Sequence, residues 1–134
     1  MFMEWFPEMS VGVDIIDSEH KKLISILNDL HDAIIADNVK QGLEVFFADA
    51  INYCDYHFSH EEAIFLGTDY PDKAAHIAAH QTMKKYLMES RNKFEQGQMN
   101  DFPEELMVFL KGWLVNHIQE TDMKYVPYLR HPKV

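Results

Sequence analysis

The sequence predicts an all-α protein that folds as an up-down-up-down antiparallel four-helix bundle with an irregular N-terminal arm. Apolar residues recur at intervals of three and four along four long segments, and short stretches rich in helix breakers separate these segments. The chain has 134 residues, of which 47% are hydrophobic, so a single domain over residues 1–134 can bury one core. Short connections between amphipathic helices favour antiparallel neighbours.

The first half of the chain predicts the arm and two helices. Residues 1–16 show no steady apolar period and are expected to pack across the bundle. Asp17 or Ser18 can cap a first helix over residues 18–37, because a short polar side chain accepts a bond from a free N–H group at a helix start. A second helix is expected over residues 41–66, after a turn that contains breaker residues.

The second half predicts two more helices. The stretch 67–72, Gly-Thr-Asp-Tyr-Pro-Asp, is expected to form a loop, and Asp72 can cap a third helix over residues 72–96. The fourth helix is expected over residues 103–123. Pro103 suits its first turn, where no backbone donor is needed, and two acidic residues follow at the positive end of the helix dipole.

Composition and charge exclude several classes of function. The net charge of −10 argues against nucleic acid and anionic membranes as partners, because both attract positively charged surfaces. No apolar stretch approaches the roughly 20 residues that cross a bilayer. The first residues lack the basic and apolar regions of a secretory signal, and Cys54 is the only cysteine, which excludes an internal disulfide and a thiolate cluster. These features predict a cytoplasmic protein without membrane insertion.

Histidines on the apolar stripes of all four expected helices are the strongest functional signal. Residues spaced by four lie on one face of a helix, about one turn apart. A buried carboxylate is costly unless it is paired or bound to a metal. A lone inward histidine is usually an ordinary core residue, but a set converging from four helices predicts a metal site. This set consists of His20, His57, Glu61, His76, His80 and His117.

The donor types narrow the choice of metal. There is no set of cysteines for a structural zinc site and no all-oxygen cage for calcium or magnesium. Imidazole mixed with carboxylate suits iron, zinc, copper or nickel. Five imidazoles are too many for one ion that keeps an open position, so two ions are favoured. The site also differs from ferritin-like di-iron sites, which are rich in glutamate.

The chain resembles the hemerythrins, and specifically the single-domain bacteriohemerythrin branch. The resemblance covers essentially the whole chain, and the order and spacing of its motifs agree. The matching segments are Trp5, Val11–His20, His57–Glu62, His76–His80 and Trp113–Asp122.

The resemblance implies two iron ions (Fe2+/Fe3+) joined by a bridging oxo or hydroxo group. It assigns His76, His80 and His117 to one iron, His20 and His57 to the other, and Glu61 and Asp122 as bridges between them. These donors fill all but one position of two octahedral irons. The vacancy is on the iron held by His20 and His57, and dioxygen is expected to bind there.

Asp122 is the ligand that helical spacing supports least. It follows His117 by five residues, which is about 140° around a regular helix. The two side chains can flank the bundle axis, or a local widening of the helix can bring them together. Without the resemblance, a solvated acid at the helix end is an equally good interpretation.

Phe58, Trp113, Leu114 and Ile118 lie next to expected ligands and are candidates for an apolar wall around bound dioxygen. Ordinary core packing is an equally good interpretation of these four residues. Three further residues have expected roles away from the metal: His31 in the core or behind the ligands, His60 at the surface, and Glu62 at the surface or behind the ligands. His131, in the tail, is expected to be solvated.

The expected function is reversible dioxygen binding for storage, transport or delivery, by a monomer that is not an enzyme. An oxygen-consuming enzyme or a reductase is a possible partner. Two alternatives remain at this point. One is oxygen or redox sensing with a partner in trans, and the other is a di-iron enzyme acting on peroxide or nitric oxide, for which the sequence offers no clear set of proton-delivery groups.

Overall fold

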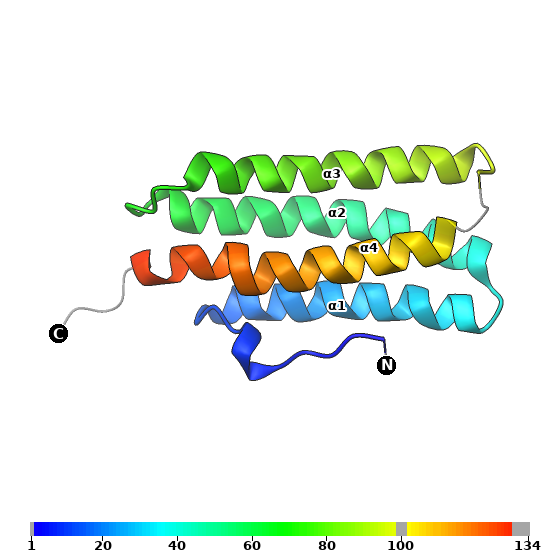
Figure 1. The fold of residues 1–134 in the computed structure, drawn as a ribbon, viewed down its shortest axis with the longest axis horizontal. Coiled ribbons are helices and arrows are strands. Elements are labelled where there is room, and N and C mark those ends of the chain that lie inside the picture. Colours follow the sequence, from blue (N-terminus) through cyan, green and yellow to red (C-terminus); the bar gives the residue numbers. More distant parts are fainter. Residues whose placement is uncertain (1, 99–101, 130–134) are drawn as a thin grey trace.

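The computed structural model describes residues 2–98 and 102–129, and its described part contains helices and no strands. The four long helices run antiparallel to their neighbours in the chain, so the bundle is up-down-up-down as predicted (Figure 1). They are α1 (Asp14–Ile35), α2 (Val39–Leu66), α3 (Lys73–Glu95) and α4 (Phe102–Asn116).

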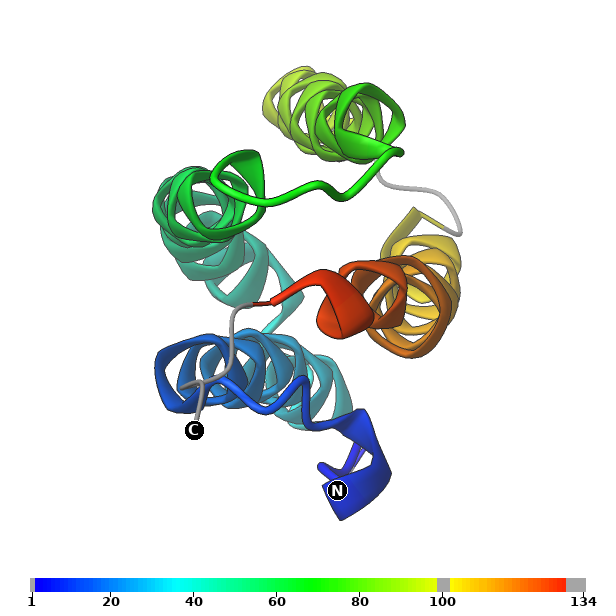
Figure 2. The same cartoon turned by 90° about the vertical axis from the view of Figure 1, so that its left-hand side faces the viewer.

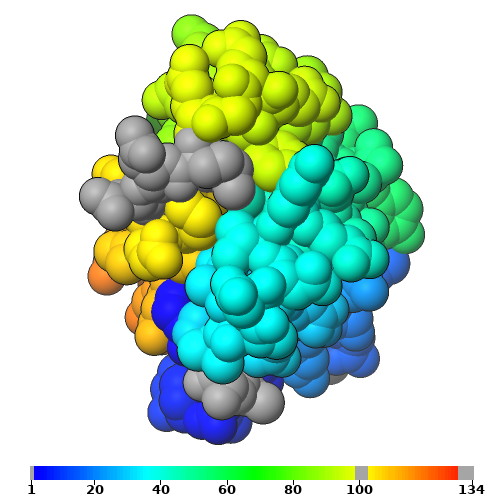
Figure 3. All heavy atoms as spheres, turned by 90° about the vertical axis from the view of Figure 1, so that its right-hand side faces the viewer, coloured from blue at the N-terminus to red at the C-terminus, as the bar shows by residue number. Residues whose placement is uncertain are grey.

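The helices follow one another around the bundle in chain order, as the view along the bundle shows (Figure 2). The end of the bundle in Figure 3 is formed by the α1–α2 connection and the C-terminal part of α3. Gly97 follows α3 with a φ of 78°, a left-handed conformation that glycine adopts without steric cost and that commonly ends a helix. The opposite end carries the functional residues described below.

The irregular N-terminal arm, which was expected to pack across the bundle, lies along α1 and also contacts Lys111 of α4 (Figure 1). Asn28 holds the arm by two hydrogen bonds, one accepted from the backbone N–H of Met3 and one donated to its carbonyl, both 2.8 Å long. Phe2 stacks on the ring of His31, with ring centroids 4.6 Å apart. His31 therefore packs against the arm and is not one of the buried histidines of the bundle.

Most helix bounds differ from the predicted ones by one or two residues, and two differ by more. The first helix begins at Asp14, four residues before the predicted start. Asp17 does not cap it, because the Asp17 carboxylate accepts hydrogen bonds from the Ser10 hydroxyl and the Val11 N–H and so binds the arm. The predicted fourth helix is regular only to Asn116. A π-helical turn (His117–Thr121) and a 3₁₀ segment (Asp122–Tyr128) follow it.

The interior of the bundle has two different halves. Toward the end at which α1 and α2 connect, the core is apolar except for the buried Ser90 near the end of α3. Toward the other end the interior contains buried polar groups, and it is closed by a second apolar cluster of Phe65, Tyr70 and Tyr125. The buried polar or charged residues among those described are Glu19, His20, His57, Glu61, His76, His80, Ser90, His117 and Asp122.

Candidate metal centre

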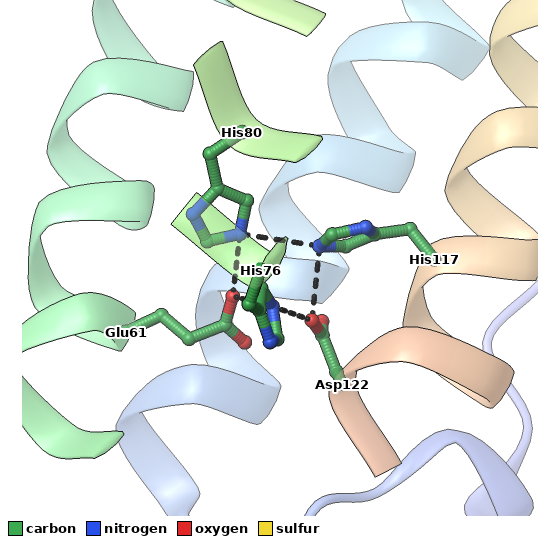
Figure 4. A group of neighbouring side chains, drawn as sticks. All are labelled: Glu61, His76, His80, His117 and Asp122. Atoms are coloured by element: carbon green, nitrogen blue, oxygen red, sulfur yellow. Dashed lines mark hydrogen bonds and ion pairs between the residues drawn. The ribbon is translucent and has the colours of Figure 1, made fainter. Parts of the chain in front are cut away.

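All four helices deliver buried donors to one place in the polar half of the bundle. Figure 4 shows α2, α3 and the chain after α4 turning five of these side chains toward one another. Each of the seven predicted ligands is at most 4% exposed. The structure therefore brings together the whole set inferred from the sequence: His20, His57, Glu61, His76, His80, His117 and Asp122.

The seven residues form two overlapping groups, in each of which the potential ligand atoms lie within 4.8 Å of one another. One group has three histidines, and we call it the three-histidine group. The other has two histidines, and we call it the two-histidine group. Both groups contain Glu61 and Asp122. The three-histidine group adds His76, His80 and His117, and the two-histidine group adds His20 and His57.

The π-helical turn explains how Asp122 reaches the centre. The Asp122 N–H bonds to the carbonyl of His117, five residues earlier, instead of the four of an α-helix. This wider turn brings two side chains onto one face that a regular helix would separate by about 140°. As a result, Oδ1 of Asp122 lies 2.9 Å from Nε2 of His117.

The Nε2 atoms of the histidines face the two shared carboxylates. Nε2 of His76 is 2.8 Å from Oδ1 of Asp122, and Nε2 of His20 is 3.1 Å from the other oxygen, Oδ2. On the α2 side, Nε2 of His80 lies 3.0 Å from Oε1 of Glu61. Each carboxylate thus has its oxygens near histidines of both groups, which is the arrangement of a bridging ligand.

Several buried atoms at the centre make no hydrogen bond, although some of them, such as Nε2 of His20 and Oδ2 of Asp122, lie within ion-pair distance of each other. These are Nδ1 and Nε2 of His20, Oε1 of Glu61 and Oδ2 of Asp122. A buried polar group without a partner costs about 1–3 kcal/mol. Metal ions placed among these atoms would satisfy the donors that face inward. The donor set therefore fits two cations bound by imidazole nitrogens and carboxylate oxygens.

The two buried carboxylates, Glu61 and Asp122, favour positive charge at the centre. Burial alone would raise the pKa of Asp122, but the neighbouring His117, His20 and His76 hold it well below its usual range. Burial alone would lower the pKa of His76, yet its hydrogen bond to Asp122 and the nearby carboxylate of Glu61 raise it to about 9. A proton on His76 thus helps to balance the two carboxylates in the metal-free chain, a role that metal cations can take over.

A second layer of side chains holds the outer nitrogens of the histidines, and only part of it was predicted. Nδ1 of His80 lies 2.8 Å from Oε2 of Glu62, which agrees with the expected role of Glu62 behind the ligands. The prediction missed Glu19, whose Oε1 lies 2.7 Å from Nδ1 of His57. The position of Glu19 next to His20 in the sequence was the available signal.

Two tyrosines that the sequence analysis did not single out also belong to this layer. The hydroxyl oxygen of Tyr70 lies 3.2 Å from Nδ1 of His76. Tyr125 is fully buried and donates a 2.8 Å hydrogen bond to Oε2 of Glu61. A carboxylate that bridges metals is commonly oriented by such an outer partner.

An apolar cavity with about 50 Å³ of space for water-sized molecules adjoins the centre. Three of the four predicted wall residues, Phe58, Trp113 and Leu114, line it, and so do three of the predicted ligands: His20, His57 and His117. The fourth, Ile118, is fully buried in the core but is not among the lining residues.

Two of the wall residues also orient histidines. Phe58 stacks on His80 with ring centroids 3.9 Å apart, and Trp113 stacks on His117 at 4.3 Å. Cys54 lines the same cavity, and burial raises the pKa of its thiol to about 12, so it contributes a neutral, weakly polar surface. The cavity wall and the support of the imidazole rings are therefore parts of one packed unit.

The remaining histidines lie outside the two groups. His31 packs against Phe2 in the arm. His60 was expected at the surface, and its side chain is 37% exposed, but it also contacts Glu19. His131 lies outside the described residues.

The fold and the donor set define a histidine- and carboxylate-rich, metal-binding four-helix bundle. Residues 11–129 match the family described as the hemerythrin HHE cation binding domain. The chain therefore belongs to the hemerythrin family, whose members are di-iron proteins that bind dioxygen.

Individual relatives agree with this assignment. A bacteriohemerythrin of Stenotrophomonas maltophilia (strain R551-3) is 32% identical over 128 residues, which covers 94% of this chain and 80% of the relative. A bacteriohemerythrin of Methylococcus capsulatus (strain Bath) is 32% identical over 122 residues and covers 91% and 92%. A crystal structure of wild-type hemerythrin superposes with a TM-score of 0.81 at 29% identity, covering 96% of this chain and 98% of that one.

Within residues 2–98 and 102–129, no helix combines the length and the apolar composition needed to cross a bilayer.

Proposed function

We propose that this protein binds dioxygen reversibly at two iron ions held by the seven buried ligands, for oxygen storage, transport or delivery. The observation that carries the proposal is the pair of overlapping donor groups that share Glu61 and Asp122. His76, His80 and His117 would hold one iron, and His20 and His57 the other. When bound, the irons supply the redox-active site at which dioxygen is taken up and released, with an oxo or hydroxo group as their third bridge.

The difference between the groups supports an open position on one side. The two-histidine group offers one imidazole fewer, so it is the side expected to leave a coordination position for a small ligand. Both of its histidines, His20 and His57, line the apolar cavity, whereas His117 is the one histidine of the other group that does so. A small apolar molecule in that cavity would therefore lie beside the less occupied group.

The protein's own residues would protect this position. Phe58, Trp113 and Leu114 present hydrocarbon and aromatic surface, which offers few partners to water. Exclusion of water slows proton delivery and so favours release of intact dioxygen over irreversible oxidation of the iron. Partners of such a function would be dioxygen itself and an oxygen-consuming enzyme or a reductase.

One experiment tests the proposal directly. Purified protein is loaded with ferrous iron under argon, its iron is counted per chain, and its visible spectrum is followed through repeated cycles of oxygen and argon. The proposal predicts about two irons per chain and a spectral change that reverses in each cycle. A preparation that holds only zinc, or a spectrum that bleaches irreversibly in the first cycle, would contradict it.

A further inference from the structure

Each of the two carboxylate oxygens of Glu19 contacts a histidine. Oε1 lies 2.7 Å from Nδ1 of His57, and Oε2 lies 2.6 Å from Nδ1 of His60. Glu19 is 3% exposed, so these two contacts replace the water that an exposed carboxylate would bind. One contact points to the metal centre and the other points to the surface.

These contacts determine which nitrogen of each ring carries a proton. A carboxylate only accepts hydrogen bonds, so both histidines must donate from Nδ1. A proton on Nδ1 of His57 leaves Nε2 as the nitrogen with a free lone pair. Glu19 therefore holds His57 in the tautomer and orientation required for binding through Nε2.

His60 contacts Glu19 from the surface side of the bundle. Its side chain is 37% exposed, and the ring of Tyr56 packs on it with centroids 4.3 Å apart. Without the His60 donor, Oε2 of the buried Glu19 would lose its only described partner, which is costly for a charged group. Glu19 would then be free to rotate toward water and to loosen its contact with His57.

The two donor groups differ in how many other supports they have. In the three-histidine group, Glu62 holds His80, Tyr70 contacts His76, and aromatic rings stack on two of the imidazoles. In the two-histidine group, neither ring nitrogen of His20 has a hydrogen-bond partner. Orientation of that group by hydrogen bonds therefore depends on the contact between Glu19 and His57.

We propose that His60 is a positioning residue for the metal centre, acting through Glu19 on His57, and that the metal ion in the two-histidine group depends on it selectively. This inference rests on the proposed metal centre. It assigns a role to His60, a partly exposed residue that is neither a predicted metal ligand nor part of the cavity lining. The chain from His60 through Glu19 to His57 connects the surface to the half of the centre that has the open position.

The test compares two substitutions of one residue in the iron-loaded protein. His60→Asn keeps an N–H donor close to the position of Nδ1, whereas His60→Leu removes it. Release of iron to an excess of chelator is followed under argon. We expect His60→Leu to accelerate the loss of one iron by about tenfold, the lower end of the effect of outer partners on metal affinity. The second iron should leave at the wild-type rate, and His60→Asn should restore the slow release of both.

Two further variants locate the effect. Glu19→Gln is close in shape and should accelerate release of the same iron by about 10–100-fold. Glu62→Gln is the matched control, because Glu62 makes the corresponding contact with His80, and it should accelerate release of the other iron. In zinc-loaded protein labelled with 15N in histidine, His60→Leu should shift the resonances of His57 and leave those of His80 unchanged.

The possible results separate this inference from the proposed function. If wild-type protein holds fewer than two irons, the proposed function fails. If it holds two irons and His60→Leu releases both at wild-type rates, or accelerates both equally, the positioning role of His60 is refuted. Should His60→Leu fail to fold, the comparison of Glu19→Gln with Glu62→Gln gives the same decision, because the inference requires them to affect different ions.

Discussion

The same four helices form an apolar half and a polar half, and different interactions hold the side chains of each half in place. In the apolar half, residues such as Leu30, Leu43 and Phe47 are at most 1% exposed, and apolar contacts stabilise them without directional requirements. In the polar half, Glu61 and Asp122 are fully buried among histidines and must be matched by donors or cations. The apolar half therefore stabilises the fold. That stability offsets the cost of burying, in the polar half, groups that water would otherwise solvate.

The local backbone reflects this difference. The helices stay regular where only packing matters, but the chain widens into a π-helical turn where His117 and Asp122 must meet. Such turns are frequent at functional sites. Substitutions in the two halves should accordingly affect different properties, and the following predictions test that separation.

The largest effect is expected from Glu61→Gln, which replaces a carboxylate shared by both donor groups with a neutral amide. Iron content should fall from about two per chain to one or none, because both ions lose a ligand. The loss of metal affinity should exceed the roughly 100-fold loss that follows removal of a side chain that only orients a ligand. Metal analysis after dialysis measures it. Glu44→Gln, an exposed acid in the first part of α2, should keep both irons. Full iron content in Glu61→Gln would refute the bridging role.

Leu43→Ala should lower stability without removing iron. Leu43 is fully buried in the apolar half and lies 14 residues before His57, which is about 21 Å along α2. Truncation of a buried leucine costs about 2–5 kcal/mol, and chemical denaturation measures this loss. Val45→Ala, at a position that is 53% exposed, should change stability by less than about 0.5 kcal/mol. Loss of iron from folded Leu43→Ala would show that the two halves are not separable.

Leu114→Ser should leave iron content unchanged and shorten the life of the oxygenated form several-fold. Leu114 lines the apolar cavity beside His20 and His57, and a hydroxyl there gives water a hydrogen-bond partner. Decay of the visible spectrum in air measures autoxidation. Leu114→Ile keeps the wall apolar and should decay at nearly the wild-type rate. Equal decay of the serine variant would count against this residue as part of the protecting wall.

The metal-free protein should lose stability as pH rises. The pKa of His76 is raised from 6.5 to about 9 in the folded state. Its stabilising contribution is therefore complete below pH 6.5 and is lost as pH rises through about 9. Melting temperatures of the metal-free chain across this range should decline, and His76→Gln should flatten the decline. Iron-loaded protein should show no such decline in melting temperature, because a metal ion takes the place of the proton on Nε2 of His76. An equal decline in the metal-free and iron-loaded forms would contradict this prediction.

Sequence periodicity was sufficient to place the donors that occupy regular helices. His57 with Glu61, and His76 with His80, are spaced by four and so share a face whatever the tertiary contacts. The antiparallel bundle also followed from the four stripes and the short connections. The family resemblance was needed for Asp122, because a π-helical turn is a local departure from the period that such an analysis assumes.

Other features depended on contacts between helices that no spacing rule contains. Glu19 reaches His57 across 38 residues of sequence, and its partner His60 was expected only as a surface residue. Asp17 was expected to cap the first helix. Its carboxylate instead accepts a hydrogen bond from Val11, because the N-terminal arm folds back onto the start of α1. Such contacts follow from the way α1 packs against α2 and the arm, which the pattern of either segment alone does not determine.

The most direct test of the two overlapping donor groups is a crystal structure of the iron-loaded protein with anomalous scattering recorded at the iron edge. The two groups predict two iron positions. Glu61 and Asp122 should contact both, three histidines should bind one, and His20 with His57 should bind the other beside the apolar cavity. A single iron position, or two positions that share neither carboxylate, would contradict this arrangement.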